Sequence, residues 1–305
     1  MKAVIVREKG SFENINVEEI DKPAIHADEI LVKVTSAGVN PVDWKTVLHG
    51  YFHMPLIPGS DIAGVIEAVG SDVKNYKPGD EIIGSLQWDK QSAFAEYVAT
   101  KEKYITHKPA NISLQESAGI PLASLTAWQA LFDHGQIEAG QKVVIHAGAG
   151  GVGLFALQLA KWKGAYVIVT ASERNIDFLK AAGADEVIDY TKYKLTDKVG
   201  DADMVLDSIV TPEAQLESFK ILKKKGHYVA ITASVREELL NGFDIHTKRF
   251  LFQSDPVQLK QIVDLIEQEK VKLFIDRRYP LTAAKAALEY VHTGRARGKV
   301  ILSVS

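Results

Sequence analysis

A run of glycines between residues 148 and 153 has the spacing G-x-G-x-x-G, and it follows the apolar stretch Val143-Val144-Ile145-His146. A segment with helical spacing, Leu154 to Lys161, comes directly after it. A strand, a glycine turn and a helix in this order can hold the pyrophosphate of a dinucleotide, because glycines allow close approach and a helix N-terminus offers N–H donors. A glycine turn with only a structural role is the alternative. The candidate cofactor residues in this run are Gly148, Gly150, Gly151, Val152 and Gly153.

The next apolar stretch ends at Val169 and leads to Ser172 and Arg174. An NAD-specific domain usually places Asp or Glu at this tip, where the carboxylate holds the ribose hydroxyls. A small hydroxyl followed by a guanidinium suits the 2′-phosphate of NADPH better. Glu173 lies between them and fits the phosphate only if it points away. The sequence therefore favours NADPH, and the alternative is that Arg174 is a solvated charge at a helix start.

The chain contains no cysteine. Disulfides, thiolate catalysis and every cysteine-based metal site are therefore excluded. His49 and His53 lie four residues apart, but the segment between them, Gly50-Tyr51-Phe52, is expected to be a loop with no third ligand nearby. The sequence predicts no metal site.

The pattern of the elements changes near residue 120. Before it, short strands such as Ile30–Val34 and Ile62–Val69 are separated by Gly and Pro turns, which predicts a mostly antiparallel β unit. After it, strand-like and helix-like runs alternate, which predicts a parallel sheet covered by helices on both faces. The strand-like tail Lys299–Leu302 has no helix behind it and is assigned back to the first unit.

The predicted fold is therefore α/β, with a β-rich catalytic domain formed by residues 1–120 and 256–305 and a doubly wound parallel-sheet domain formed by residues 121–255. Apolar residues make up 46% of the chain and charged residues 25%, and the net charge is −3. No nucleic-acid or membrane partner is expected from this composition, and the N-terminal apolar stretch is too short for a signal peptide. A cytoplasmic location is the expectation.

The chain resembles the zinc-independent quinone oxidoreductase and enone reductase branch of the medium-chain dehydrogenase/reductase superfamily. The resemblance runs nearly from end to end and rests on motifs in a specific order. These motifs are Met1-Lys2-Ala3-Val4, Gly38-Val39-Asn40-Pro41-Val42-Asp43-Trp44-Lys45, Pro58-Gly59-Ser60-Asp61-Ile62-Ala63-Gly64-Val65-Ile66, Lys77-Pro78-Gly79-Asp80, Ala95-Glu96-Tyr97, Leu125-Thr126-Ala127-Trp128 and Gly298-Lys299-Val300.

This resemblance implies a GroES-like domain beside a Rossmann domain, an active site in a cleft between them, and a homodimer. It also locates the positions of the catalytic zinc ligands, because the zinc alcohol dehydrogenases hold Zn²⁺ with two Cys and one His. Aligned through the shared motifs, the three ligand positions are Asn40, Ser60 and Leu122. All three ligands are therefore replaced, and an enzyme without zinc is expected.

Without a Lewis acid, the alkoxide that forms from a simple ketone has little to stabilise it. A quinone or an α,β-unsaturated carbonyl compound accepts hydride more easily, because delocalisation carries the negative charge onto oxygen. The expected function is thus NADPH-dependent reduction of a small-molecule quinone or enone.

Four residues are candidates for the chemistry. Asn40 offers an amide donor to the substrate carbonyl, or else it is a turn residue. Lys45 matches a lysine that faces the substrate in the enone reductases and can stabilise an enolate, or else it is a surface lysine on a short helix. Asp43 is expected to organise the turn, and Tyr51 is expected to pack more than to donate a proton. The size of the site depends on aromatic residues, namely Trp44, Tyr51, Phe52 and Trp88.

Three further cofactor residues follow from the family pattern. Thr126 matches a threonine beside the nicotinamide, and Tyr190 matches a tyrosine near the adenosine. Ser208 follows the strand-like run that ends at Asp207, where the next strand-to-helix loop meets the cofactor.

Two rival functions remain open. An enoyl-thioester reductase uses the same fold and hydride chemistry, but it needs a cationic patch for the carrier. A non-catalytic NADPH-binding protein is the second rival, for which the basic run Lys223-Lys224-Lys225 could serve RNA binding. A solvated helix C-terminus is the more common role of such a run.

Overall fold

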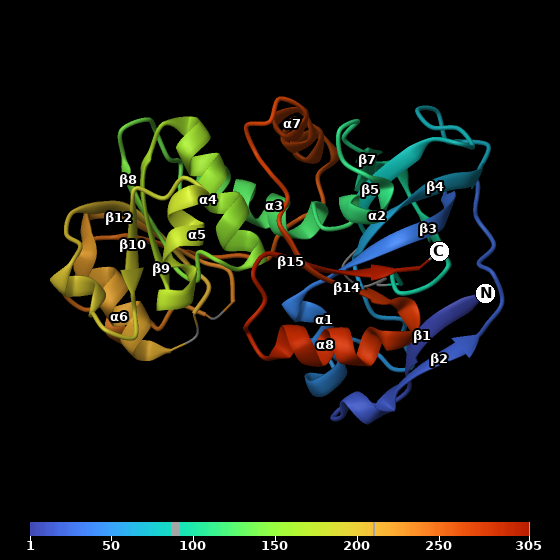
Figure 1. The fold of residues 1–305 in the computed structure, drawn as a ribbon, viewed down its shortest axis with the longest axis horizontal. Helices are drawn as coiled ribbons and strands as arrows, with labels where there is room; N and C mark the ends of the chain where they lie inside the picture. Colours follow the sequence, from blue (N-terminus) through green and yellow to red (C-terminus); the bar gives the residue numbers. More distant parts are fainter. Residues whose placement is uncertain (87–91, 210, 233, 305) are drawn as a thin grey trace. The chain divides into compact units, whose positions relative to one another are not determined.

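The computed structural model describes residues 1–86, 92–209, 211–232 and 234–304. The chain forms two compact units, which are coloured by sequence in Figure 1. Unit 1 contains Met1–Leu125, Ser254–Glu269 and Leu273–Ser305, and unit 2 contains Thr126–Gln253 and Lys270–Lys272. Residues 270–272 thus group with unit 2, and the domain boundaries expected at 120/121 and 255/256 stay predictions.

Unit 1 is built on a seven-stranded sheet with the order β14-β15-β3-β4-β5-β7, and β6 pairs with β3 beside this path. Its strands pair antiparallel except β14 and β15, which are parallel. The strands are β3 (Ile30–Val39), β4 (Asp61–Val69), β5 (Glu81–Ser85), β6 (Tyr97–Thr100), β7 (Ile105–His107), β14 (Ile275–Pro280) and β15 (Lys299–Ser303). A separate two-stranded antiparallel sheet consists of β1 (Lys2–Val6) and β2 (Ile15–Glu19).

The α-helices of unit 1 are between four and twelve residues long. They are α1 (Pro41–His49), α2 (Leu114–Ser117), α7 (Pro256–Glu267) and α8 (Ala284–His292), and α3 (Pro121–Trp128) begins here. α1 starts with Pro41 at its first position and ends at Gly50, whose φ of 70° is left-handed and suits glycine. α8 packs against α1 and against β15 and β3.

Unit 2 contains a six-stranded sheet with the order β10-β9-β8-β11-β12-β13. Every neighbouring pair in it is parallel. Its strands are β8 (Lys142–Ile145), β9 (Tyr166–Ala171), β10 (Glu186–Asp189), β11 (Ala202–Asp207), β12 (Leu222–Ala230) and β13 (His246–Arg249). The strand order reverses next to β8: β9 and β10 lie on one side of β8, and β11, β12 and β13 lie on the other. Such a reversal is typical of a doubly wound nucleotide-binding sheet. The predicted fold class is confirmed.

In the described part of unit 2, three α-helices connect the strands: α4 (Gly151–Lys163), α5 (Ile176–Ala181) and α6 (Pro212–Ile221). α4 packs on β8 and β9, and α6 packs on β11 and β12. Because β8 and β9 are buried along most of their length, their side chains are almost wholly apolar. This packing holds the carboxyl ends of the central strands at one edge of the sheet.

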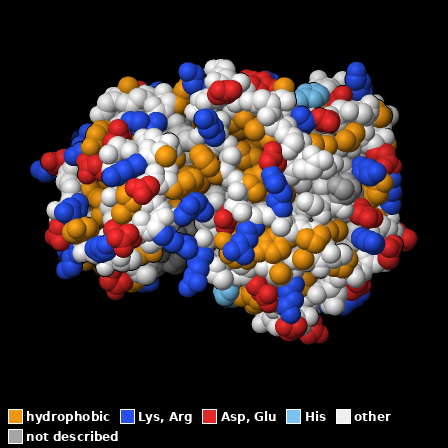
Figure 2. Space-filling model, viewed as in Figure 1, with side chains coloured by type: hydrophobic (Ala, Val, Ile, Leu, Met, Phe, Trp, Pro, Cys, Tyr) orange, Lys and Arg blue, Asp and Glu red, His pale blue; other side chains and the backbone are white. Residues whose placement is uncertain are grey.

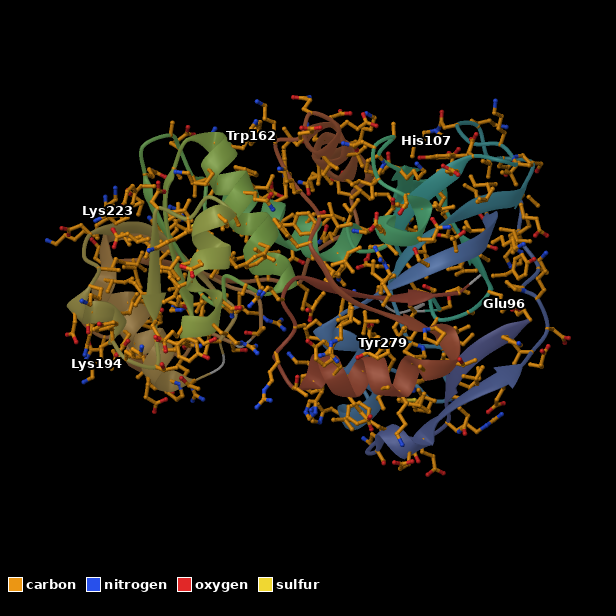
Figure 3. All side chains as sticks on the ribbon, viewed as in Figure 1. Glu96, His107, Trp162, Lys194, Lys223 and Tyr279 are labelled. Carbon is orange, nitrogen blue, oxygen red and sulfur yellow. The ribbon has the colours of Figure 1, made fainter. Side chains whose placement is uncertain are left out.

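The basic run at residues 223–225 is not a helix end, which corrects the sequence interpretation. α6 ends at Ile221, and the three lysines lie exposed in β12. The pairing register with β11 shifts here, because Ala202 pairs with Leu222 and Met204 pairs with His227. β12 therefore has extra residues opposite β11 here. Lys225 adopts a φ of 60°, and Lys223 forms an ion pair with Asp203. In Figure 3, Lys223 points away from unit 2.

The charged side chains on the surface reflect the nearly equal numbers of acidic and basic residues in the chain. Acidic and basic side chains are mixed over the visible face of unit 1 (Figure 2). Within the described ranges, no helix is both long enough and apolar enough to cross a membrane.

Candidate functional site

The glycine turn connects β8 to α4 at the carboxyl edge of the parallel sheet. A methyl group on Gly153 would lie 2.5 Å from the carbonyl oxygen of Ala147, and one on Gly148 would lie 2.7 Å from Cβ of Val169. These two glycines are therefore required by packing. A methyl group on Gly150 would meet only the oxygen of Ala147, at 3.4 Å, so the space in front of Gly150 is open. Such a cradle fits a pyrophosphate, which needs an unobstructed approach to the backbone.

The first turn of α4 supplies the donors for this cradle. Gly150 is the residue before the helix, and Gly151 and Val152 are its first two residues. The first N–H groups of an α-helix have no partner inside the helix and carry partial positive charge. The structure therefore brings the five residues of the predicted run into one turn, and their contact with a cofactor stays a prediction.

The residues predicted for the adenosine end come from two adjacent strands. Ser172 follows β9 directly, and Tyr190 follows β10. These strands are paired, and N of Tyr190 donates to O of Ala171 at 3.3 Å, so Tyr190 and Ser172 lie beside each other. Arg174 is exposed two residues further on, and Tyr190 is 60% exposed. Both are placed where a ligand over this edge could reach them.

Glu173 forms an exposed ion pair with a neighbouring lysine. Nζ of Lys192 lies 2.6 Å from Oε1 of Glu173, and it lies 3.9 Å from Oδ2 of Asp189. The carboxylate of Glu173, which lies between the two residues predicted to bind the phosphate, is thus paired with Lys192.

Ser208 and Thr126 differ in their surroundings. Oγ of Ser208 donates to O of His146 at 3.2 Å, which places Ser208 against the start of the glycine turn. Thr126 lies on α3 and is buried, at 7% exposure. Its expected place beside the nicotinamide stays a prediction.

Unit 1 contains a buried polar cluster around Asn40, at the junction of β3 and α1. N of Asn40 donates to Oδ2 of Asp43 at 2.7 Å, and Nδ2 of Asn40 donates to Oδ2 of Asp61 at 2.9 Å. Nζ of Lys299 donates to Oδ1 of Asn40 and lies 3.5 Å from Oδ2 of Asp61. Both ends of the Asn40 amide are therefore bound inside unit 1, and its predicted contact with a substrate carbonyl stays a prediction.

The charges of this cluster are strongly influenced by burial. Asn40, Asp43, Asp61 and Lys299 are each at most 3% exposed. Burial raises the pKa of Asp43 to about 8, against the opposing effect of the hydrogen bond from Asn40. Burial also raises the pKa of Asp61 and lowers the pKa of Lys299, and the attraction between the two opposes both shifts. The cluster therefore holds Asp43 mostly neutral near pH 7 beside the Asp61–Lys299 ion pair.

Asp61 also fixes the start of α3. Its Oδ1 accepts a hydrogen bond from N of Leu122 at 2.9 Å. Because the first N–H groups of a helix need external acceptors, the carboxylate acts as a tertiary cap. In the sequence, Asp61 and Lys299 are parts of family motifs and are not among the predicted site residues. A lysine inside the apolar strand pattern Lys299–Leu302 was the available signal.

Lys45 lies in the middle of α1, and Tyr51 lies in the loop that follows this helix. Lys45 is half-buried, and burial lowers the pKa of its ammonium. Its Nζ lies 5.6 Å from the ring centroid of Trp44. Tyr51 is 54% exposed in the loop after α1 and lines a cavity of about 750 Å³ within unit 1. Trp88 lies outside the described residues.

The three positions expected to replace zinc ligands carry no thiol or imidazole. Ser60 is fully buried, Leu122 has an alkyl side chain, and the amide of Asn40 is bound as described above. In the part of the chain that the structure describes, no group of three or more His, Cys, Asp or Glu side chains is arranged to hold a metal ion. His49 ends α1, and His53 is exposed in the following loop.

Comparison with known proteins identifies the family. Residues 26–110 match the alcohol dehydrogenase GroES-like domain, and residues 182–302 match the family model described as zinc-binding dehydrogenase. The chain is 37% identical to 2-methylene-furan-3-one reductase of Solanum lycopersicum and 36% identical to the chloroplastic NADPH-dependent alkenal/one oxidoreductase of Arabidopsis thaliana. Each of these alignments covers 99% of this chain and 79% of the relative.

Among solved structures, the quinone oxidoreductase from Coxiella burnetii superposes with a TM-score of 0.94 at 32% identity, over 100% of this chain and 99% of that one. The domains, the relatives and this structure agree in pointing to one branch. The chain belongs to the medium-chain dehydrogenase/reductase superfamily, in its quinone oxidoreductase branch.

Proposed function

We propose that this chain is an NADPH-dependent oxidoreductase that reduces quinones or α,β-unsaturated carbonyl compounds. The observation that carries the proposal is the glycine cradle, which leads at the same sheet edge to Ser172 and Arg174. Relatives named as alkenal/one, furanone and quinone reductases support the acceptor class. NADPH supplies a hydride, and the protein supplies orientation and charge stabilisation.

The adenosine end suits a 2′-phosphate. A dianionic phosphate needs cations and hydroxyl donors, and it is repelled by an unpaired carboxylate. Arg174 and Ser172 provide the first two, and the ion pair of Glu173 with Lys192 removes the third. Tyr190 presents an exposed ring beside them, on which an adenine can stack.

Lys45 is the proposed electrostatic partner of the substrate oxygen. When hydride adds to the β-carbon of an enone, the electron pair moves to oxygen, and an ammonium nearby stabilises that charge. A lysine whose pKa is lowered also gives up a proton more readily, so Lys45 is suited to return one. Asn40 is proposed as a second donor to the oxygen, Asp43 as the organiser of the turn, and Tyr51 as a packing wall for the acceptor.

We further propose that the reaction uses no zinc. The side chains at the three expected ligand positions are an amide, a hydroxyl and an alkyl group, and such a set lacks the thiolate and imidazole ligands that zinc prefers. Metal analysis of the purified protein, together with turnover before and after chelation, tests this point. Stoichiometric zinc, or activity lost to a chelator and restored by Zn²⁺, would contradict it.

Two competing functions make different predictions. An enoyl-thioester reductase would turn over a CoA enoyl thioester in preference to a free enone. A non-catalytic NADPH-binding protein would bind the cofactor without turnover of any acceptor. The homodimer and the cytoplasmic location expected from the sequence stay predictions, and the Arabidopsis relative named above is chloroplastic.

The deciding experiment measures oxidation of NADPH and of NADH with a benzoquinone, a short-chain enone and a CoA enoyl thioester. Selective use of NADPH with the quinone or the enone is expected. Arg174→Ala should raise KM for NADPH about tenfold and leave KM for NADH unchanged, since NADH lacks the 2′-phosphate that the guanidinium is proposed to bind. Arg236→Ala, which removes an exposed arginine paired with Glu238, is the control. Equal use of NADH by the parent protein would remove the phosphate-pocket argument.

A further inference from the structure

A buried chain of hydrogen bonds lies beneath the glycine turn of unit 2, and its centre is the side chain of His146. His146 directly follows β8 and precedes Ala147. Its ring is 5% exposed and lies between β9 and α6. Nδ1 is 3.1 Å from Oγ1 of Thr170, and Nε2 is 2.9 Å from Oγ of Ser218.

The positions of the protons in this chain follow from its outer end. Oγ of Ser218 donates its single proton to the carbonyl oxygen of Ala214, at 2.7 Å. Toward His146 this oxygen can therefore only accept, so Nε2 carries the ring proton. In a neutral imidazole Nδ1 is then an acceptor, and the hydroxyl of Thr170 donates to it. Only one tautomer satisfies every partner.

The inner end of the chain is the glycine turn itself. With its proton directed at His146, Oγ1 of Thr170 turns a lone pair toward N of Ala147, at 3.4 Å. The carbonyl oxygen of Thr170 also accepts from N of Gly148, at 3.0 Å. Ala147 has a φ of 51°, a left-handed conformation that is unfavourable for a residue with a Cβ and is kept only where its surroundings hold it.

Burial favours the neutral form of His146. It lowers the pKa of the ring, against the smaller opposing effect of the carboxylates of Asp207 on β11 and Glu217 on α6. The backbone of His146 is held as well, because its N donates to O of Leu206 at 3.0 Å and its O accepts from Ser208. Every polar atom of the residue thus has a partner.

We propose that His146, as the neutral Nε2–H tautomer, is a positioning residue that sets the glycine turn for the phosphates of the cofactor through Thr170. This inference rests on the proposed function, since it concerns the same cofactor site. The hydrogen bond between the ring and Thr170 controls cofactor affinity, and the hydrogen bond between the ring and Ser218 fixes the tautomer.

Two substitutions separate the two sides of the ring. The amide of His146→Asn places an oxygen near the position of Nδ1, so it keeps an acceptor for Thr170. The longer amide of His146→Gln places its nitrogen near the position of Nε2, so it keeps a donor to Ser218 and loses the acceptor. We expect His146→Gln to raise the Kd for NADPH about tenfold, the equivalent of one hydrogen bond, and His146→Asn to raise it less than about threefold.

Thr170 gives an independent pair of variants. Thr170→Val keeps the shape and loses the hydroxyl, and we expect it to raise the Kd about tenfold. Thr170→Ser keeps the hydroxyl and should bind like the parent. Urea midpoints of all four variants separate loss of affinity from loss of folding, since a merely structural role would lower stability without ranking the affinities in this order.

The tautomer itself is measured by ¹⁵N NMR of the histidine ring nitrogens in the parent protein. A protonated Nε2 and an unprotonated Nδ1 are expected. A protonated Nδ1, equal affinities of His146→Gln and His146→Asn, or an unchanged Kd in Thr170→Val would each overturn the proposal. If the parent bound no NADPH, the proposed function would fail with it, and the NMR result would still show whether the hydrogen-bond chain exists.

Discussion

Replacement of Asp43 by asparagine should make the protein more stable than its parent at high pH, and the gain should grow as the pH rises. The carboxyl of Asp43 is fully buried, and its pKa is raised from 3.8 to about 8. The native state therefore binds this proton more tightly than the unfolded chain does. The stability from this group is fully present below about pH 4 and is lost as the pH rises through about 8.

The size of the effect follows from this difference. Between pH 5 and pH 8 the unfolded carboxyl is mostly ionised while the native one is mostly protonated, so the parent loses about 3 to 4 kcal/mol. Asparagine does not titrate, has nearly the same size, and keeps an oxygen that can accept from N of Asn40.

Urea unfolding at pH 5, 6, 7 and 8 measures the free energy of unfolding of Asp43→Asn and of the parent. The difference between them should shift in favour of the variant by about 3 to 4 kcal/mol across this range. Asp21→Asn, at an exposed position, is the control for the removal of a surface carboxylate. Parallel curves for Asp43→Asn and the parent would refute the reasoning, because they would mean that Asp43 ionises alike in both states.

Three other perturbations test separate parts of the structure. Asp61→Asn leaves the ammonium of Lys299 buried without its counter-charge and should cost about 3 to 5 kcal/mol in the free energy of unfolding, which urea titration measures. Gly153→Ala places a methyl group 2.5 Å from a backbone oxygen and should weaken NADPH binding at least about tenfold in a fluorescence titration. The control for this variant is Gly200→Ala, where an added methyl group would have no atom within 4 Å, and it should bind NADPH like the parent. Lys45→Met should lower kcat about tenfold or more. Because burial lowers the pKa of Lys45, the parent's kcat should fall at alkaline pH, and a pH–rate profile of the variant should lack this fall.

The elements could be predicted where local pattern and tertiary packing agree. The glycine turn is specified by a short apolar strand, three glycines at fixed spacing and a helical run, and each of these is readable in sequence. The basic run at residues 223–225 could not be read in this way. A helix that ends at Ile221 and a strand that starts at Leu222 leave no turn residue between them, and the bulge opposite β11 depends on a partner strand that is distant in sequence.

The candidate site also combines contacts that are local in the sequence with contacts between distant strands. The contact of Asn40 with Asp43 in α1 is local in the sequence, whereas its other two polar partners, Asp61 in β4 and Lys299 in β15, come from strands that the chain joins only after folding. Sequence patterns describe the alternation of buried and exposed residues along one strand, but they do not say which charge on one strand meets a charge on another. The cluster around Asn40 and the ring of His146 both arise where such strands end side by side, so the residues that set charge in unit 1 and orientation in unit 2 became visible only in the folded chain.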